Sequence, residues 1–358
     1  MIKPSDLEPA PLARAQTIPS AWYTDPRFLE LERLAIFGCT WQGIGHAAQV
    51  EEPGCYFLAE VAGEPLIVVR GKDRVLRAFY NVCRHRGGPL ALTDGCANAL
   101  QCKYHGWTYR LDGTLRGVPG MDRTELFDRS NYGLIPVRVD CWQGLVFVNL
   151  DANAPPLTEV TAGIGERIAP LRLDSLRFAR RVDYLVECNW KVYVDNYLEG
   201  YHVPYVHPEL AKLYDYQQYT TSTSRWHSLQ HSPLTGDSLY SADGSGEAFY
   251  YFLFPNFMLN ILPGRLQTNL VLPEGADRCR VIFQYFYDAV DGNGAAERIA
   301  ADLAYSDGVQ AEDAEICALV QRGLRSRSYD RGRFSVRYEA GVHHFQELLR
   351  EHYRAAQS

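Results

Sequence analysis

The sequence predicts a two-part α+β protein, an all-β unit followed by an antiparallel sheet with helices packed across one face. Residues 40–152 hold short alternating or apolar runs divided by turn signals, a pattern typical of strands. Further strand-like and helical patterns follow residue 156. The strand-like runs are 179–188, 248–262, 266–272 and 279–288, and the helical runs are 190–202, 308–324 and 337–354.

A chain of 358 residues is long enough for two hydrophobic cores. The run DANAPP at 151–156 is typical of a linker. Residues before the β unit read as an extended arm and a short helix that begins near Asp25-Pro26. We therefore expect an arm and helix over residues 1–39, a β unit over 40–152 and a sheet-and-helix domain over 153–358.

Composition limits the partners and the location. The net charge of −7 argues against nucleic acid and anionic membranes, which select basic surfaces. No run approaches the roughly 18 apolar residues of a membrane span, and the first residues lack a secretory apolar region. We expect a cytoplasmic protein without a membrane or nucleic-acid partner.

Nine cysteines are scattered along the chain. The odd count, the wide dispersal and the expected location favour reduced thiols over a disulfide framework. A cysteine with a histidine two or three residues away then becomes a candidate metal ligand, and Cys83 and Cys102 qualify. Cys96 lies between them, but the two loops offer it no partner cysteine.

These two cysteines form the pattern C-x-H…C-x2-H, with Cys83 and His85 in one loop and Cys102 and His105 in the other. Two thiolates and two imidazoles suit tetrahedral zinc or a [2Fe–2S] cluster in which histidines hold one iron. Zinc fingers usually pair two cysteines and then two histidines, so one of each per loop favours the cluster. Glycines in both loops allow backbone N–H groups to approach the sulfurs.

The segments CRHRGGPL and CKYHGWTY resemble the Rieske domain of ring-hydroxylating and related oxygenases. The resemblance implies a Rieske [2Fe–2S] cluster held by Cys83, His85, Cys102 and His105. Respiratory Rieske proteins are a competing subclass, but they usually add a disulfide between the loops. A Rieske ferredoxin would need no second domain, and about 200 residues follow the linker.

A second group of ionisable residues lies in the apolar, aromatic segment 189–207. Glu199 and His202 are three apart and are expected on one face of a helix. His202 and His207 are five apart, which an uninterrupted helix would separate by about 140°. Pro204 removes a helix hydrogen bond between them, so the chain can kink and bring the histidines together. Two histidines and a carboxylate form the triad of non-haem Fe(II) oxygenases.

Asp313 is the candidate carboxylate, since it is the only charge on the helical stripe 313, 316, 317, 320 and 324. A carboxylate on an apolar stripe is costly unless it is paired or bound to metal. Glu312 and Glu315 point about 100° and 200° away and are expected to be solvated.

This block is similar to the catalytic domain of Rieske oxygenases, whose fold is a helix-grip (START-like) domain. The similarity implies that His202, His207 and Asp313 bind mononuclear Fe(II). It also implies that Glu199 bridges to a Rieske histidine of the neighbouring subunit and that Asp195 is an acid that supports the iron ligands without binding the iron. Members of the family assemble head to tail as homotrimers. They take electrons from a separate NAD(P)H-dependent flavin and iron–sulfur reductase, with or without a ferredoxin, and they use O2.

The glutamate at 199 and the short chain look like the choline, carnitine and glycine-betaine monooxygenase branch. A quaternary ammonium substrate needs an aromatic cage for cation–π contact. Two alternatives stay open, an aromatic-ring dioxygenase acting on an aromatic acid held by arginine, and a zinc-stabilised small-molecule binding module. The candidate cage residues are Tyr193, Tyr197, Tyr201, Tyr205, Trp226, Tyr250, Tyr251, Phe252 and Phe254.

Overall fold

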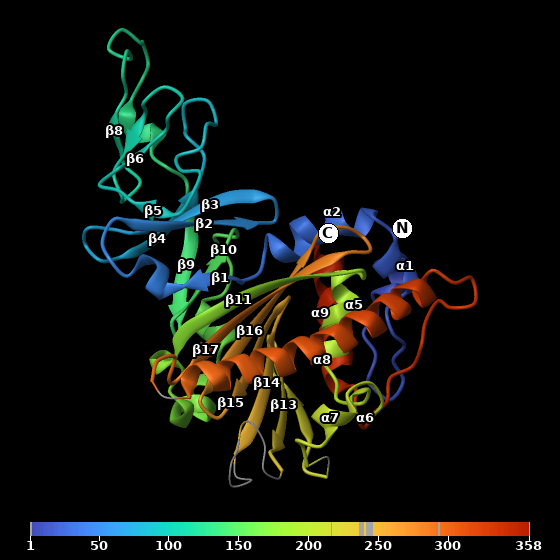
Figure 1. Cartoon of the computed structure of the whole chain (residues 1–358). Coiled ribbons are helices and arrows are strands. Elements are labelled where there is room, and N and C mark those ends of the chain that lie inside the picture. Colours follow the sequence, from blue (N-terminus) through green and yellow to red (C-terminus); the bar gives the residue numbers. More distant parts are fainter. Residues whose placement is uncertain (1, 216, 236–239, 241–245, 293, 358) are drawn as a thin grey trace. The chain divides into compact units, whose positions relative to one another are not determined.

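The protein forms two compact units in a computed structural model that describes residues 2–357 except 216, 236–239, 241–245 and 293. The β unit comprises residues 37–158, and the helix–sheet unit comprises residues 1–36 together with 159–358. All the paired strands of the larger sheets are antiparallel, which confirms the predicted α+β class (Figure 1).

The β unit contains a seven-stranded and a three-stranded sheet. Residues 66–69 of β3 are buried on both faces of the strand, since alternate residues enter two separate cores. The large sheet has the order β1 (Gln42–His46), β10 (Leu145–Asn149), β9 (Pro136–Trp142), β4 (Leu76–Tyr80), β3 (Glu64–Arg70), β2 (Cys55–Val61) and β5 (Gly95–Cys96). The small sheet has the order β6 (Leu100–Gln101), β7 (Thr108–Tyr109) and β8 (Leu115–Gly117).

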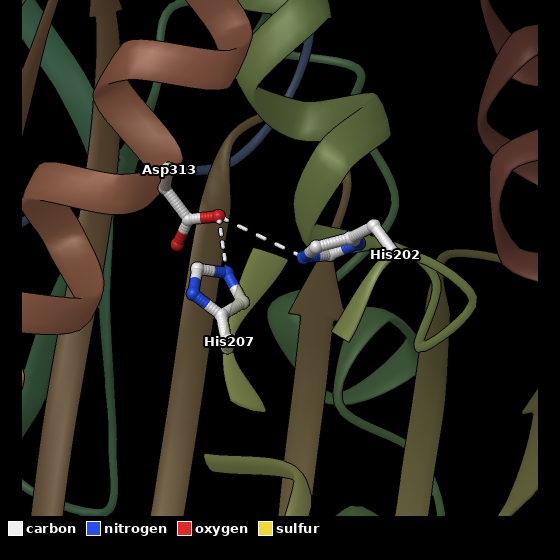
Figure 2. A group of neighbouring side chains, drawn as sticks. All are labelled: His202, His207 and Asp313. Carbon is white, nitrogen blue, oxygen red and sulfur yellow. Dashed lines mark hydrogen bonds and ion pairs between the residues drawn. The ribbon is translucent and has the colours of Figure 1, made fainter. Parts of the chain in front are cut away.

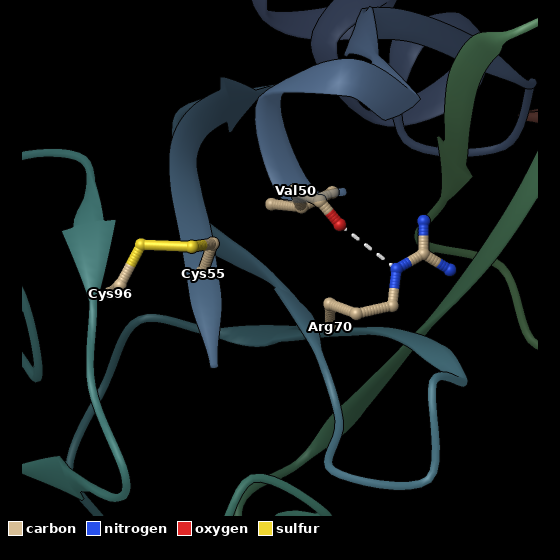
Figure 3. Close-up of a disulfide and its surroundings, with 4 residues drawn as sticks. All are labelled: Val50, Cys55, Arg70 and Cys96. Carbon is tan, nitrogen blue, oxygen red and sulfur yellow. Dashed lines mark hydrogen bonds between the residues drawn. A yellow bond between two sulfur atoms is a disulfide. The ribbon is translucent and has the colours of Figure 1, made fainter. Parts of the chain in front are cut away.

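One expectation about the cysteines is wrong. Cys55 and Cys96 form a disulfide, because Cys55 of β2 lies opposite Cys96 of β5 in the large sheet (Figure 3). On the other side of β2, Arg70 Nε of β3 donates a hydrogen bond to the carbonyl oxygen of Val50 at 2.9 Å. The other seven cysteines are free thiols, as expected. The partner of Cys96 comes from 41 residues upstream and not from a ligand loop, so local spacing gave no sign of the pair.

The helix–sheet unit contains a second seven-stranded sheet, with the long helix α8 lying across one face of it (Figure 1). The order is β11 (Arg177–Val186), β17 (Cys279–Tyr287), β16 (Arg265–Pro273), β15 (Phe257–Leu262), β14 (Glu247–Leu253), β13 (His227–Pro233) and β12 (Thr220–Thr223). The α-helices are α1 (Ser20–Thr24), α2 (Arg27–Glu32), α3 (Leu157–Val160), α4 (Ile164–Ile168), α5 (Trp190–Tyr197), α6 (Val203–Val206), α7 (Pro208–Ala211), α8 (Ala295–Leu324) and α9 (Ala340–Ala355).

Two helices differ from the expected ones. The helix expected over 190–202 ends at Tyr197, so Glu199 and His202 are not on one helix face. The helix expected over 308–324 begins at Ala295, thirteen positions closer to the N-terminus than expected. The side chains that the first turns of α8 bury against the sheet are mostly polar. The sequence of these turns therefore lacks the helical spacing of apolar residues. Among the described residues, no helix combines the length and apolar character needed to cross a bilayer.

The N-terminal arm is fixed to α5 by a buried ion pair. Glu32 of α2 pairs with Lys191 and accepts a hydrogen bond from Trp190 Nε1 at 2.6 Å. The side chain of Asn189 caps α5 by accepting from the backbone N–H of Lys191 at 3.0 Å. The Asn-Trp-Lys run of the sequence is therefore structural, since it fixes the start of the helix that leads to the triad.

Candidate metal centres

The two ligand loops of the β unit have the same backbone geometry. In each loop the cysteine N–H donates to the carbonyl oxygen five residues later, at 2.8 Å for Cys83 and 2.9 Å for Cys102. The glycine four residues after each cysteine donates back to the cysteine carbonyl and has a positive φ, 75° at Gly87 and 74° at Gly106. Glycine adopts this left-handed conformation without steric cost. Two equivalent loops therefore present one cysteine each.

The four candidate ligands gather at the ends of these loops. The rings of His85 and His105 have centroids 4.7 Å apart, and His85 stacks on Trp107 at 4.8 Å. Burial raises the pKa of the Cys83 thiol, and the thiol of Cys102 is among the neighbours that raise it further. The structure thus brings the two cysteines together and the two histidines together.

Three observations test whether these residues fit a bound inorganic group. His85 Nδ1 is buried and has no hydrogen-bond partner among the described residues, as a ring nitrogen that binds metal would be. A Cβ atom at Gly88 would lie 2.9 Å from Cys102 Sγ, so only glycine leaves that sulfur accessible. Burial lowers the pKa of His105, which favours the neutral imidazole that binds metals. The residues fit a [2Fe–2S] cluster.

The second site lies in the helix–sheet unit, where Figure 2 shows His202, His207 and Asp313 facing one another. Their ligand atoms all lie within 4.8 Å of one another. Asp313 Oδ1 is 2.9 Å from His207 Nε2 and 3.7 Å from His202 Nε2. The three side chains come from α8, the end of α6 and the residue preceding α6. This arrangement has the donor set of a two-histidine, one-carboxylate iron site.

Chain geometry around Pro204 explains how the histidines meet. Pro204 lies in the first turn of the short helix α6, where a missing N–H is tolerated. His202 precedes this helix and His207 follows it, so the two rings are brought to 5.2 Å apart. The predicted break at Pro204 is present, although two separate helices replace the single kinked one.

Each candidate ligand also has a polar partner outside the triad. Glu199 Oε1 lies 2.7 Å from His202 Nδ1, and Glu312 Oε2 lies 2.6 Å from His207 Nδ1. Asn196 Nδ2 donates to Asp313 Oδ1 at 2.6 Å. Carboxylates behind metal-binding histidines fix the tautomer and direct the other ring nitrogen, here Nε2, toward the metal.

Glu312 is exposed, as expected, but its carboxylate also contacts His207 of the site. Its helical direction was correctly placed about 100° from Asp313, but the loop that carries His207 passes alongside α8 there. Burial opposes charge on His207, while hydrogen bonds and charges from Asp313 and Glu312 raise its pKa above the usual value. The sequence signal for Glu312 and Asn196 was only their adjacency to Asp313 and Asp195.

Asp195 is also buried, but its hydrogen bonds lead away from the triad. Its carboxylate accepts from Tyr23 Oη at 2.5 Å and from Gln346 Nε2 at 3.2 Å. Burial raises the pKa of Asp195 to about 7, although hydrogen bonds from Tyr23 and Gln346 lower it. Asp195 therefore connects α5 to Tyr23 and Gln346. A role in catalysis stays a prediction.

Beside the triad lies a cavity of about 130 Å³, below the roughly 300 Å³ at which pockets for drug-sized ligands begin. It lies between α5, α8 and the sheet, and His202, His207 and Asp313 are in its wall. Of the candidate cage residues, the structure places Tyr193, Tyr197 and Tyr250 in the lining. Other tyrosines that the sequence did not single out also line it, namely Tyr214, Tyr219, Tyr240 and Tyr305.

Other candidate cage residues lie elsewhere. Tyr201 and Tyr205 are exposed, and Tyr201 stacks on Tyr338. Phe254 packs against Phe345 of α9. Tyr251 and Tyr250 are neighbours on one strand and so face opposite sides of the sheet. The strand period could have separated these residues, but the register of β14 was not known from the sequence.

Family models match both parts of the chain. A family model for the Rieske [2Fe–2S] domain matches residues 40–136, and one for the ring-hydroxylating alpha subunit (catalytic domain) matches residues 173–355. Choline monooxygenase, chloroplastic, of Arabidopsis thaliana is 38% identical over 95% of this chain and 83% of its own. The carnitine monooxygenase oxygenase subunit of Escherichia coli is 33% identical over 94% of this chain and 93% of its own.

Solved structures show the same fold. The quaternary ammonium Rieske monooxygenase CntA in complex with L-carnitine superposes with a TM-score of 0.84 at 31% identity, over 97% of this chain and 99% of that one. Naphthalene 1,2-dioxygenase with indole bound has a TM-score of 0.77 at 19% identity, over 96% and 94% of the two chains, which shows likeness of fold alone.

Proposed function

Because the chain belongs to the Rieske oxygenase family, we propose that it oxidises a small quaternary ammonium compound. The chain is the oxygenase component, an oxidoreductase that incorporates oxygen from O2 and whose cofactors are a Rieske [2Fe–2S] cluster and a mononuclear iron. The match to the Rieske domain explains the Cys and His loops, so a zinc-stabilised binding module is no longer needed to explain them. One observation carries the choice of substrate, the tyrosine-lined cavity beside the triad.

Tyrosine rings bind a quaternary ammonium group through cation–π contact, which needs no counter-charge and tolerates methyl groups. Tyr214 makes edge-to-face contacts with Tyr219 at 6.2 Å and with Tyr250 at 6.0 Å. The three rings thus form part of one wall of the cavity. The relatives named for choline and carnitine act on quaternary ammonium compounds.

In the working enzyme Cys83, His85, Cys102 and His105 would hold the cluster, and His202, His207 and Asp313 would hold the iron. The cluster supplies single electrons, and the iron activates O2 for insertion into a C–H bond. Glu199 and Glu312 hold the imidazoles with Nε2 toward the metal, and Asn196 orients the Asp313 carboxylate. The tyrosines place the substrate beside the triad and exclude water.

We also propose that the subunits form a head-to-tail homotrimer in which Glu199 connects His202 to His85 or His105 of the next subunit. A solved relative is described as giving insight into inter-subunit electron transfer. A separate NAD(P)H-dependent flavin and iron–sulfur reductase, with or without a ferredoxin, would deliver the electrons. We place the enzyme in the cytoplasm.

A substrate panel tests the proposed activity. The holoenzyme, with its cluster reduced by dithionite and the excess removed, is mixed with O2 and with choline, glycine betaine, L-carnitine or benzoate. We expect at least one trimethylammonium compound to yield oxidised product in a single turnover, and benzoate to yield none. Product from benzoate and from none of the ammonium compounds would favour the aromatic-acid alternative and overturn the proposal.

Replacing Glu199 by glutamine tests the bridging role. The amide keeps the size and one acceptor oxygen of the carboxylate but removes its charge, so both metals are expected to stay bound. We expect substrate-dependent oxidation of the reduced cluster to slow by about 10- to 100-fold, the usual cost of losing a carboxylate behind a metal-bound histidine. Stopped-flow absorbance of the cluster measures this rate.

A matched control is Glu339→Gln. Glu339 lies near Glu199, since burial and the charge of Glu199 raise its pKa, but its carboxylate accepts a hydrogen bond from the Ser335 N–H. This variant should keep the wild-type rate. An unchanged rate in Glu199→Gln would remove Glu199 from the electron path.

A further inference from the structure

The wall that α8 contributes to the cavity carries polar groups at increasing distance from the triad. Asp313, Gln310 and Tyr305 all line the cavity. With a rise of about 1.5 Å per residue, Gln310 lies about one turn from Asp313 along the helix, and Tyr305 lies about two turns away. A substrate with its reacting carbon near Asp313 therefore extends past Gln310.

Gln310 has a buried donor for which the described residues offer no hydrogen-bond acceptor. Its side chain is 2% exposed, and its Oε1 accepts a hydrogen bond from Tyr193 Oη at 2.6 Å. Its Nε2 has no partner among the described residues, and the same is true of the buried hydroxyl of Tyr305. Buried donors are nearly always satisfied in folded proteins. An oxygen on the bound molecule would satisfy Gln310.

The cavity also has a single arginine, and it is already neutralised. Among the described lining residues Arg265 is the one lysine or arginine. Its Nε donates to Asp302 Oδ2 at 2.7 Å and its Nη2 to Gln267 Oε1 at 2.5 Å. Asp302 also accepts from Tyr240 Oη at 2.6 Å and from Tyr287. A substrate carboxylate would have to share Arg265 with Asp302, and burying it without its own cation is costly.

We infer that the substrate is a hydroxyl-bearing ammonium cation without a carboxylate, and that Gln310 selects it by donating a hydrogen bond to its hydroxyl. This inference rests on the proposed function and narrows it. The tyrosines that line the cavity bind the cation, and the Gln310 amide binds the hydroxyl oxygen. The Arg265–Asp302 ion pair disfavours a carboxylate at the other end of the substrate.

Equilibrium binding to the anaerobic holoenzyme tests this without turnover. Calorimetry compares choline with ethyltrimethylammonium, which lacks only the hydroxyl, and with glycine betaine, which carries a carboxylate. We expect choline to bind about 10- to 100-fold more tightly than ethyltrimethylammonium, the usual effect of leaving a buried donor unpaired. Glycine betaine should bind at least about tenfold more weakly than choline. Gln310→Met should remove the preference for choline and leave the affinity for ethyltrimethylammonium unchanged.

Gln321 provides a matched control on the same helix. It is also 2% exposed, its Oε1 accepts from the Asn189 N–H at 2.9 Å, and its Nε2 is likewise unpaired among the described residues. It does not line the cavity, so Gln321→Met should keep the choline preference. Loss of the preference in both variants would mean a structural effect and overturn the role of Gln310.

Binding of the panel to the wild-type protein distinguishes failure of the Gln310 inference from failure of the proposed function. Equal affinity for choline and either analogue would overturn the selection of a hydroxylated, carboxylate-free cation while leaving quaternary ammonium oxidation intact. Binding of benzoate in the absence of binding by any of the three cations would overturn the proposed function itself.

Discussion

Replacing Asp313 by alanine is expected to remove the mononuclear iron and all measurable oxygenation while leaving the cluster spectrum unchanged. Asp313 supplies the only carboxylate of the triad, and its Oδ1 faces both histidine Nε2 atoms. Loss of a residue that hydrogen-bonds to a metal ligand already lowers metal affinity or activity about 10- to 100-fold. Loss of the ligand itself should lower them further. Metal analysis should find about two irons per chain in place of about three.

The effect should be local, because the cluster residues belong to the other unit of the chain. The control is Glu315→Ala, which removes an exposed carboxylate two residues along α8. It should keep full iron content and activity. Wild-type iron content in Asp313→Ala, measured beside an intact cluster signal, would require a different third ligand.

Replacing Cys83 by serine should abolish the cluster and destabilise the β unit. Cys83 and Cys102 lie in one hydrophobic core together with Leu90, Trp107 and Tyr109. Cys83 Sγ also lies 3.3 Å from Tyr109 Oη, so its position is coupled to the packing of that core. Because binding of an inorganic group and folding are coupled, we expect loss of both the cluster and the cooperative unfolding of this unit.

Absorbance and EPR spectra of the reduced protein, with acid-labile sulfide counted, measure the first effect, and thermal unfolding followed by circular dichroism measures the second. Cys141→Ser is the matched control, since Cys141 is an exposed free thiol on β9 of the same unit. A Rieske signal of wild-type intensity in Cys83→Ser would exclude Cys83 as a ligand. The mononuclear iron should stay bound in both variants.

Much of the fold followed from local patterns. Turn residues and alternating runs placed the β unit over residues 40–152, where β1 to β10 lie, because strand alternation is a local property. The end of α5 was not predicted, because the sequence after Tyr197 continues the helical pattern. In the structure the chain leaves the helix there, and Glu199 and His202 line the cavity. The short strands β5 and β6 were missed because pairing, rather than composition, defines them.

The cysteine prediction failed for the same reason. Whether a thiol meets another depends on which strands are neighbours, and the pairing of β2 with β5 joins residues 41 positions apart. Nothing in the spacing around Cys55 or Cys96 carries that information. The prediction of free thiols was correct for the other seven cysteines, Cys39 and Cys141 among them.

The sequence by itself determined the chemistry of this protein. Two cysteines and two histidines in matching loops, two histidines around Pro204 and one aspartate on an apolar stripe specified the donor sets, because ligand identity is written in residue types and short spacings. The tertiary structure decided what surrounds them. Glu312 meets His207 across 105 positions and Asn196 meets Asp313 across 117, while Arg265 is neutralised by Asp302. Such contacts arise only when α8 packs against α5, the segment that carries His207 and the sheet, so they set the orientation of the ligands and the selectivity of the cavity.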